Sequence, residues 1–271
     1  MSYLVIDLTA HKTNMLHTLG IVSPAPVLPT ILAMHALDKK LGGRLDVRGV
    51  GLIHRHSAPW IEHLDDKGYL KPALVQRRGT YLFDSEENLY GIPMQPMALA
   101  DIEWTLVLHC ENDVSDVSAV IGMLHTMRLA GGRIQGIKAR TFDQWDKAVS
   151  ALRTGRWIDD VTPMLQSGPN PIQALLSATR PGARNTEGWV VPANLGYALL
   201  EDPIARQGAR DGRPHAFVED MVGLVRYTSL FQARTKGLKP ANLWRYGWDG
   251  DQFLVTNRQD VSLTPGRAAT V

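Results

Sequence analysis

The order of the predicted strands and helices constrains the fold of this chain more than any other feature of its sequence. Alternating apolar residues indicate strands, and apolar residues at helical spacing indicate helices. The expected elements are a strand at 3–8, a helix at 27–41, strands at 47–55 and 101–110, a helix at 113–129 and a strand at 134–142. This order matches the split β-α-β arrangement. We therefore predict an α+β, ferredoxin-like (RRM-like) fold, in which a four-stranded antiparallel sheet carries two helices on one face.

Two segments lie outside this expected core. Residues 57–100 form a far longer link than two neighbouring strands need, and links of this length are usually functional or disordered. The patterns after residue 142 are a helix at 143–154, a strand at 189–197, a helix at 215–233 and a hairpin with Asp249-Gly250 as its turn. We therefore expect a core domain at 1–142 with a long insertion at 57–100, followed by a mixed α/β part at 143–271.

The run from Met127 to Ile134 joins the second predicted helix to the strand that follows it. It contains Gly131-Gly132, with Arg128 and Arg133 on either side. Gly131 suits the left-handed residue that ends many helices, so one interpretation is a simple helix stop. Two glycines also leave backbone N–H groups unshielded, so that an anion or a nucleic-acid backbone can approach closely. The basic residues around the pair favour this second interpretation.

The charge of the chain is balanced as a whole and concentrated in two segments. The formal net charge is only +2, which by itself does not indicate a nucleic-acid-binding protein. Residues 124–156 contain seven Lys and Arg against two Asp, and residues 203–245 contain eight against three acidic residues. Lys138 and Arg140 lie on the same face of their predicted strand. Each basic segment is either a binding surface or an ordinary solvated face.

The long insertion contains Arg77-Arg78-Gly79-Thr80-Tyr81. Two arginines beside an aromatic ring suit a site that holds a phosphate backbone while a base stacks on the ring. An arginine pair on the surface with no ligand is an equally good interpretation of these residues.

The sequence contains no recognisable catalytic or cofactor motif. It has no Walker loop, nucleophile elbow, dinucleotide fingerprint or paired zinc motif. His54 and His56 share a strand face, but two histidines without a carboxylate at a known spacing make a weak metal-ligand set. The Asp159-Asp160 pair lacks a third carboxylate for magnesium. We therefore predict a binding protein with no catalytic residues, metal or cofactor.

The single cysteine, Cys110, excludes a disulfide framework and a thiolate metal cluster. No apolar run approaches the roughly 20 residues that a membrane helix needs. The first residues lack the pattern of a signal peptide. We therefore expect a soluble, cytoplasmic protein without a membrane partner.

Several segments resemble the Csy-two subunits of type I-F CRISPR surveillance (Cascade) complexes, which belong to the Cas-five family of the RAMP superfamily. The most specific of them is Met127-Arg128-Leu129-Ala130-Gly131-Gly132-Arg133-Ile134. The others, in the same order along the chain as in the family, are 20–26, 47–55, 188–192, 209–213, 217–219 and 243–246.

The resemblance implies a non-catalytic subunit of a ribonucleoprotein for antiviral defence. Such a subunit grips the 5′ handle of the crRNA, contacts the large subunit and the first backbone subunit, and meets target DNA only through the complex. It implies that the insertion at 57–100 is a thumb, and that the part at 143–271 packs on the core and on partner subunits. The RNA-binding residues that it implies are Arg128, Gly131, Gly132, Arg133, Lys138 and Arg140, then Arg77, Arg78 and Tyr81 in the thumb, and finally Arg55, Asn14 and Arg245.

Two alternatives of other classes stay open. Some Cas-five relatives cut their own guide RNA, and a repeat-RNA endonuclease of this kind would use His54 or His109 at the cleaved phosphate. A scaffold that binds mainly proteins would use Trp244 and Trp248 as interface anchors.

Overall fold

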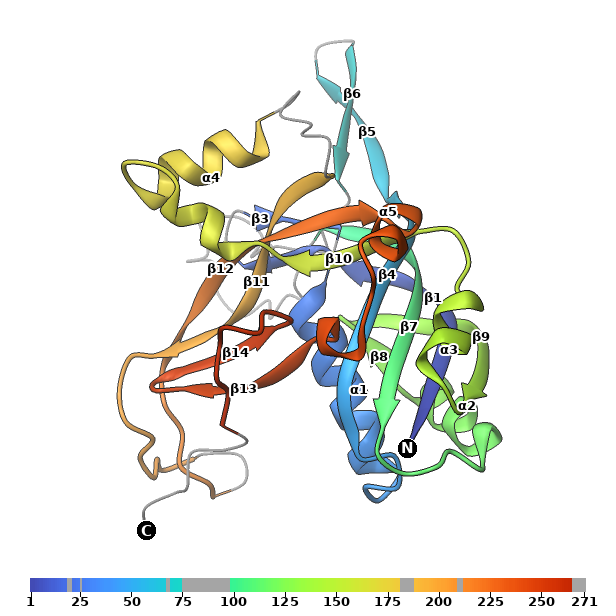
Figure 1. The fold of residues 1–271 in the computed structure, drawn as a ribbon. Helices are drawn as coiled ribbons and strands as arrows, with labels where there is room; N and C mark the ends of the chain where they lie inside the picture. The colour runs from blue at the N-terminus through green and yellow to red at the C-terminus, as the bar shows by residue number, and fades with distance from the viewer. Residues whose placement is uncertain are drawn as a thin grey trace, which may run out of the picture.

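A large antiparallel sheet dominates the structure, a computed structural model that describes residues 1–18, 21–24, 26–66, 69–74, 98–180, 188–208 and 212–264 (Figure 1). For 62–66 and 69–74 it describes the backbone alone. The strands of this sheet are β1 (Ser2–Asn14), β4 (Val47–Pro59), β7 (Leu99–Cys110), β8 (Arg128–Leu129), β9 (Gly132–Phe142), β10 (Arg156–Asp160), β11 (Trp189–Leu199), β12 (Val218–Ser229), β13 (Arg245–Asp249) and β14 (Gln252–Thr256). They lie in the order β13-β14-β11-β12-β10-β4-β7-β1-β9-β8.

The helices flank this sheet. Short polar side chains begin three of them: Asp116 accepts a hydrogen bond from the N–H of Ala119, and Asn170 and Ser229 cap their helices in the same way. The helices are α1 (Val27–Lys40), α2 (Val117–Thr126), α3 (Trp145–Ser150), α4 (Pro171–Thr179) and α5 (Leu230–Thr235), with 3-10 turns at Thr162–Gln166 and Pro240–Asn242. No helix in the part of the chain described is both long and apolar enough to cross a membrane.

The alternation along β1 divides the core into two layers. Leu4, Ile6 and Leu8 belong to the cluster under α1 and α2. Tyr3 and Val5 point to the opposite face, where they join residues of α3 and α5 in a second, smaller cluster. Successive side chains of a strand point to opposite faces, so the middle of the sheet is buried on both sides.

The prediction of a four-stranded ferredoxin-like sheet with two helices is wrong. The four strands that it named, β4, β7, β1 and β9, are neighbours, but they lie within a ten-stranded sheet with five α-helices among the described residues. β10 pairs with β4 at Arg156–His54 and Trp157–Ile53, and β12, β11, β14 and β13 follow it. An edge strand exposes unpaired backbone groups, and the later strands cover that edge of β4.

A second prediction, a helix at 215–233, is also wrong. Its apolar spacing fits a helix, but the segment is the strand β12 followed by the short helix α5. β12 contains Val218, Val222, Val225 and Thr228, and β-branched side chains favour strands. It also pairs with β11 and β10, so the sheet satisfies its backbone from both sides.

The C-terminal strands return to β4. Just before β13, Trp244 exchanges two backbone hydrogen bonds with Val50, at 2.8 and 2.9 Å. The Trp244 side chain is fully buried, and its indole N–H donates to the carbonyl of Ile158 at 2.9 Å. The strands β4, β10, β12, β11, β14 and β13 therefore close into a ring.

Two small antiparallel ribbons complete the described part: β2 (Leu16–Thr18) with β3 (Ile21–Val22), and β5 (Ile61–Asp66) with β6 (Tyr69–Leu74). The β5–β6 ribbon projects beyond the end of β4, at the top of Figure 1. The predicted thumb residues Arg77, Arg78 and Tyr81 lie outside the described residues.

Candidate nucleic-acid interface

A tight hairpin joins β8 to β9. Leu129 pairs with Gly132, which leaves Ala130 and Gly131 as the turn, with φ of +45° and +80°. Positive φ at both central residues is typical of a type I′ turn, whose twist matches that of the strands it joins. The expected helix stop at Gly131 is therefore wrong, because α2 already ends at Thr126 and a hairpin separates it from β9.

The two glycines of the turn have different roles. A Cβ on Gly132 would lie 2.5 Å from the Thr13 hydroxyl oxygen and 2.8 Å from the His11 carbonyl oxygen. Gly132 therefore allows β9 to pass close to β1. A Cβ on Gly131 would meet nothing within 4 Å, and this residue is exposed. Of the pair, Gly131 is the one that a ligand can approach.

Replacing Gly132 with alanine should lower the free energy of unfolding by about 1–3 kcal/mol, because the new Cβ must push two strands apart. Gly131→Asn should lower it by less than about 1 kcal/mol, since asparagine adopts the left-handed conformation readily. Denaturant unfolding of both variants measures this difference. Equal losses would mean that the close approach of Gly132 to β1 adds no cost of its own.

Arg128 and Arg133 face each other across the hairpin. Both are exposed, and Arg128 donates to the carbonyl of Gly131 at 3.4 Å. Neither forms an ion pair with a described residue. Like charges directly opposite each other on a sheet repel, so an anion bound between them would relieve the repulsion.

Asn14 lies beside the same turn, because its N–H donates to the carbonyl of Ala130 at 2.9 Å. Its side chain is engaged within the protein. The amide oxygen accepts from the N–H groups of Leu16 and Ala98 at 3.0 and 3.2 Å, and the amide nitrogen donates to the Leu16 carbonyl. The structure places Asn14 as a residue that fixes the end of β1.

Lys138 and Arg140 lie on one face of β9, as predicted, but their surroundings differ. Arg140 is 3.5 Å from the carboxylate of Asp7, which is 6% exposed and accepts a hydrogen bond from Thr105. Arg140 is therefore held against the sheet. Lys138 is exposed and forms no ion pair with a described residue. It is the freer cation of the two.

Arg55 reaches the same face of the sheet from β4, where it is 3.8 Å from the carboxylate of Glu103 on β7. The sequence reasoning did not select the acidic residues Asp7, Asp101 and Glu103 that lie between the basic ones. The alternation of β1 and β7 could have identified them, because it places these acidic side chains on the face of the sheet opposite to the apolar residues under α1 and α2.

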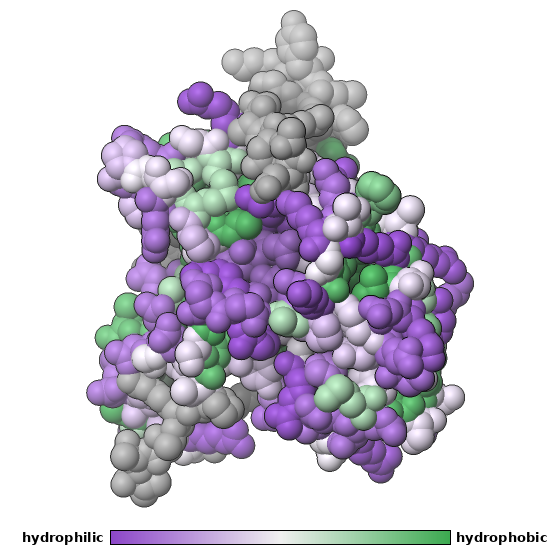
Figure 2. Space-filling model, viewed as in Figure 1, coloured by the Kyte–Doolittle hydropathy of each residue, from purple (hydrophilic) through white to green (hydrophobic). Residues whose placement is uncertain are grey.

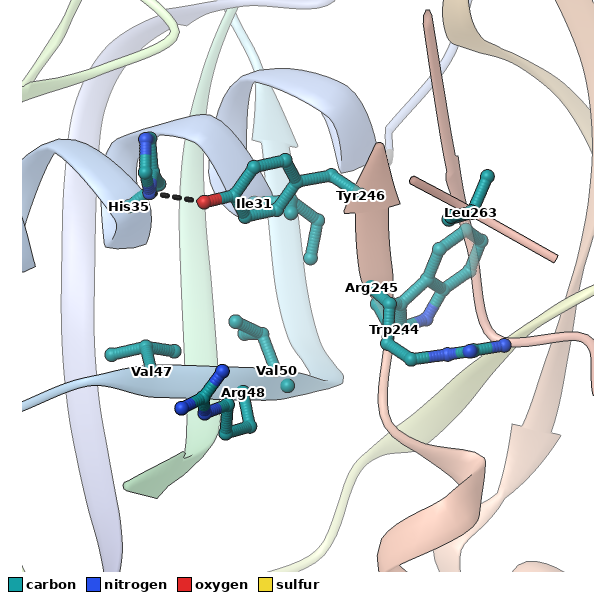
Figure 3. Close-up of a pocket in the computed structure, with 10 residues that line it drawn as sticks. Ile31, His35, Val47, Arg48, Val50, Trp244, Arg245, Tyr246 and Leu263 are labelled. Carbon is teal, nitrogen blue, oxygen red and sulfur yellow. Dashed lines mark hydrogen bonds between the residues drawn. The ribbon is translucent and has the colours of Figure 1, made fainter. Parts of the chain in front are cut away.

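Arg245 does not join these residues. It lines a cavity of about 230 Å³ between α1, β4 and β13, with His35, Trp244 and Tyr246 (Figure 3). Its guanidinium donates to the carbonyl of Arg258 at 2.7 Å. The Tyr246 hydroxyl is hydrogen-bonded to His35 Nδ1. Because α1 covers the other face of the sheet, this cavity is separate from the hairpin site.

The proposed nuclease histidines are both packed against aromatic rings. His54 lies edge-on to Trp104 and Tyr227, and burial, then the charges of His56 and Arg156, lower its pKa to about 4. His109 stacks on Tyr3 at 5.0 Å, and burial lowers its pKa as well. His54 is buried and His109 is half-buried.

The surface viewed in Figure 2 is predominantly hydrophilic, with smaller hydrophobic patches, one of them beside α4. Ile172 and Leu176 of α4 are 70% and 63% exposed. Trp244, by contrast, is fully buried within the chain. The prediction that Trp244 anchors a protein interface is therefore wrong.

Comparisons with known proteins add little to this geometry. No protein-family model matches the sequence, and no curated protein matches it. Among solved structures, the chain is similar to one described as the crystal structure of a CRISPR protein from Archaeoglobus fulgidus. The TM-score is 0.27 and the identity 10%, over 94% of this chain and 98% of that chain. A TM-score this low carries no argument about function, so the CRISPR interpretation depends on the sequence segments.

Proposed function

We propose that this protein is a non-catalytic RNA-binding subunit of a type I-F CRISPR surveillance complex, and that it grips the 5′ handle of the crRNA. The observation that carries the proposal is the exposed β8–β9 turn with its opposed pair, Arg128 and Arg133. The most specific of the resembling segments is this same hairpin. The resembling segment and the exposed charge therefore select the same site.

The chemistry of the hairpin suits an RNA backbone. Single-stranded RNA is recognised through its phosphates and through bases that are splayed out of a stack. Arg128 and Arg133 supply two guanidinium groups for phosphate, and Gly131 leaves the turn open. Lys138, further along β9, extends the positive charge on the sheet face.

The partners follow from the resemblance alone. As a handle-gripping subunit, the protein would contact the large subunit and the first backbone subunit, and would meet target DNA through the assembled complex. These contacts are part of the proposal.

The test is to express the tagged chain with its repeat-spacer RNA, purify it with and without the large subunit, and sequence the RNA retained. Fragments that share one defined 5′ handle are expected. Random RNA in both purifications would contradict the proposal. Incubating purified repeat RNA with the chain, without metal, serves as the control, because cleavage there would favour the endonuclease alternative.

A further inference from the structure

An exposed tryptophan at the end of β4 is held in a fixed orientation by neighbouring strands. The Trp60 indole donates a hydrogen bond to the carboxylate of Asp101 on β7, and its backbone N–H donates to the carbonyl of Leu99 at 2.8 Å. Asp101 also accepts from the backbone N–H of Lys12 at 2.9 Å and lies 3.3 Å from His11 Nδ1. We call Trp60, Lys12, His11 and Asp101 the Trp60 platform.

The carboxylate at the centre of the platform is held ionised. Burial acts to raise the pKa of Asp101, but the hydrogen bonds from Lys12, Trp60 and His11 outweigh it and lower the pKa below its usual value. A charged Asp101 is the stronger acceptor, so it fixes the indole and the β1 backbone together. Lys12 itself has a φ of +56°, a conformation that non-glycine residues rarely adopt.

The indole presents a ring that is available to a ligand. Trp60 is 37% exposed, and the Lys12 ammonium lies over its ring, 4.7 Å from the centroid. A single exposed hydrophobic residue needs no explanation by itself. Here the ring lies beside the half-buried Asp101 and carries the Lys12 ammonium over its face, and an aromatic ring together with a cation suits a stacked nucleotide.

The platform lies at the same end of the sheet as the β8–β9 hairpin. His11 of the platform pairs directly with Arg133 of β9, and Asp101 pairs with Ala58 of β4. The strands β4, β7, β1 and β9 are consecutive neighbours, so about 14 Å separates the two outer ones. A short single strand of RNA can span this distance across the polar face of the sheet.

We propose that Trp60 stacks a base of bound single-stranded RNA while Lys12 moves off the ring to contact the phosphate of the same nucleotide. The inference depends on the proposed function. It adds that Trp60 contacts a base of the RNA, whereas the hairpin residues contact its phosphates. Stacking of a base on an aromatic ring is stronger than an exposed cation–π contact, so the base displaces Lys12 from the ring.

The test compares two labelled RNAs of equal length, an oligoadenylate and an abasic strand with the same phosphates, on the full chain. The wild-type protein should bind the oligoadenylate more tightly. Trp60→Ala should weaken oligoadenylate binding by about 5- to 150-fold and leave abasic binding unchanged, because only the stacked base is lost. Trp60→Phe, which keeps an aromatic ring, should retain most of the preference for the oligoadenylate.

Phe231→Ala is the matched control, since Phe231 is 79% exposed on α5. It should change the binding of neither RNA. Equal oligoadenylate affinity for wild type and Trp60→Ala would overturn the stacking inference and leave the proposed function intact. If the wild-type chain bound neither RNA, the proposed function and the inference would both fail. An equal loss for both RNAs in Trp60→Ala would mean that the residue only supports the fold.

Discussion

Replacing Trp244 with alanine should lower the free energy of unfolding by about 3–5 kcal/mol, one of the largest effects expected of a single substitution in this chain. Trp244 is fully buried, and its indole N–H is bonded to the Ile158 carbonyl. Its backbone also pairs with Val50, where the ring of strands closes. Chemical denaturation followed by circular dichroism measures the change.

Phe231→Ala serves as the control for this experiment, and it should change stability by less than about 0.5 kcal/mol because the side chain is exposed. A small effect of Trp244→Ala would mean that the closure between β13 and β4 contributes little to stability.

Neutralising Arg128, Arg133 and Lys138, which form no ion pair with a described residue, should have the largest effect on RNA binding. In the triple variant Arg128→Gln, Arg133→Gln and Lys138→Gln, we expect roughly 10- to 100-fold weaker binding of single-stranded RNA near physiological salt. The slope of log K against log salt should fall by about 2, since each lost phosphate contact removes about 0.7. Fluorescence anisotropy over a series of salt concentrations gives both quantities.

A matched triple on the other side of the sheet controls for net charge. Lys39, Lys40 and Arg44 are exposed at and after the end of α1, and α1 covers the opposite face. Changing all three to glutamine should leave the salt slope unaltered. If both triple variants lowered the slope of log K against log salt equally, RNA binding would depend on the net charge of the protein. The hairpin would then not be a specific binding site.

The central strands could be predicted from sequence because their signal is local. Alternation in β1 and β7, and helical spacing in α1, are visible within a window of ten or so residues. The number of strands in the sheet depends on non-local pairing. Whether β10 joins β4, for example, depends on residues about a hundred positions apart. The same limit explains β12. Its apolar spacing fits a helix, but pairing with β10 and β11 stabilises it as a strand.

The residues of the candidate site also differ in whether the sequence alone could identify them. Arg128, Gly131 and Arg133 could be selected because they are adjacent in the chain. The Trp60 platform combines residues of β1 and β7 with Trp60, which follows β4, so no stretch of sequence displays it. Arg245 matched the resembling segments, yet it lies in a cavity on the other side of the sheet. The three thumb residues, Arg77, Arg78 and Tyr81, stay predictions.

The contact between Val50 and Trp244 also has a kinetic consequence. The two residues are separated by roughly 200 positions, and non-local pairings of this kind slow the folding of a domain. During synthesis β4 emerges before the strands that cover its edge. An uncovered strand edge is a site for pairing with other chains. The nascent protein is therefore most prone to aggregate before β10 emerges, and its ring of strands closes only after Trp244 has been made.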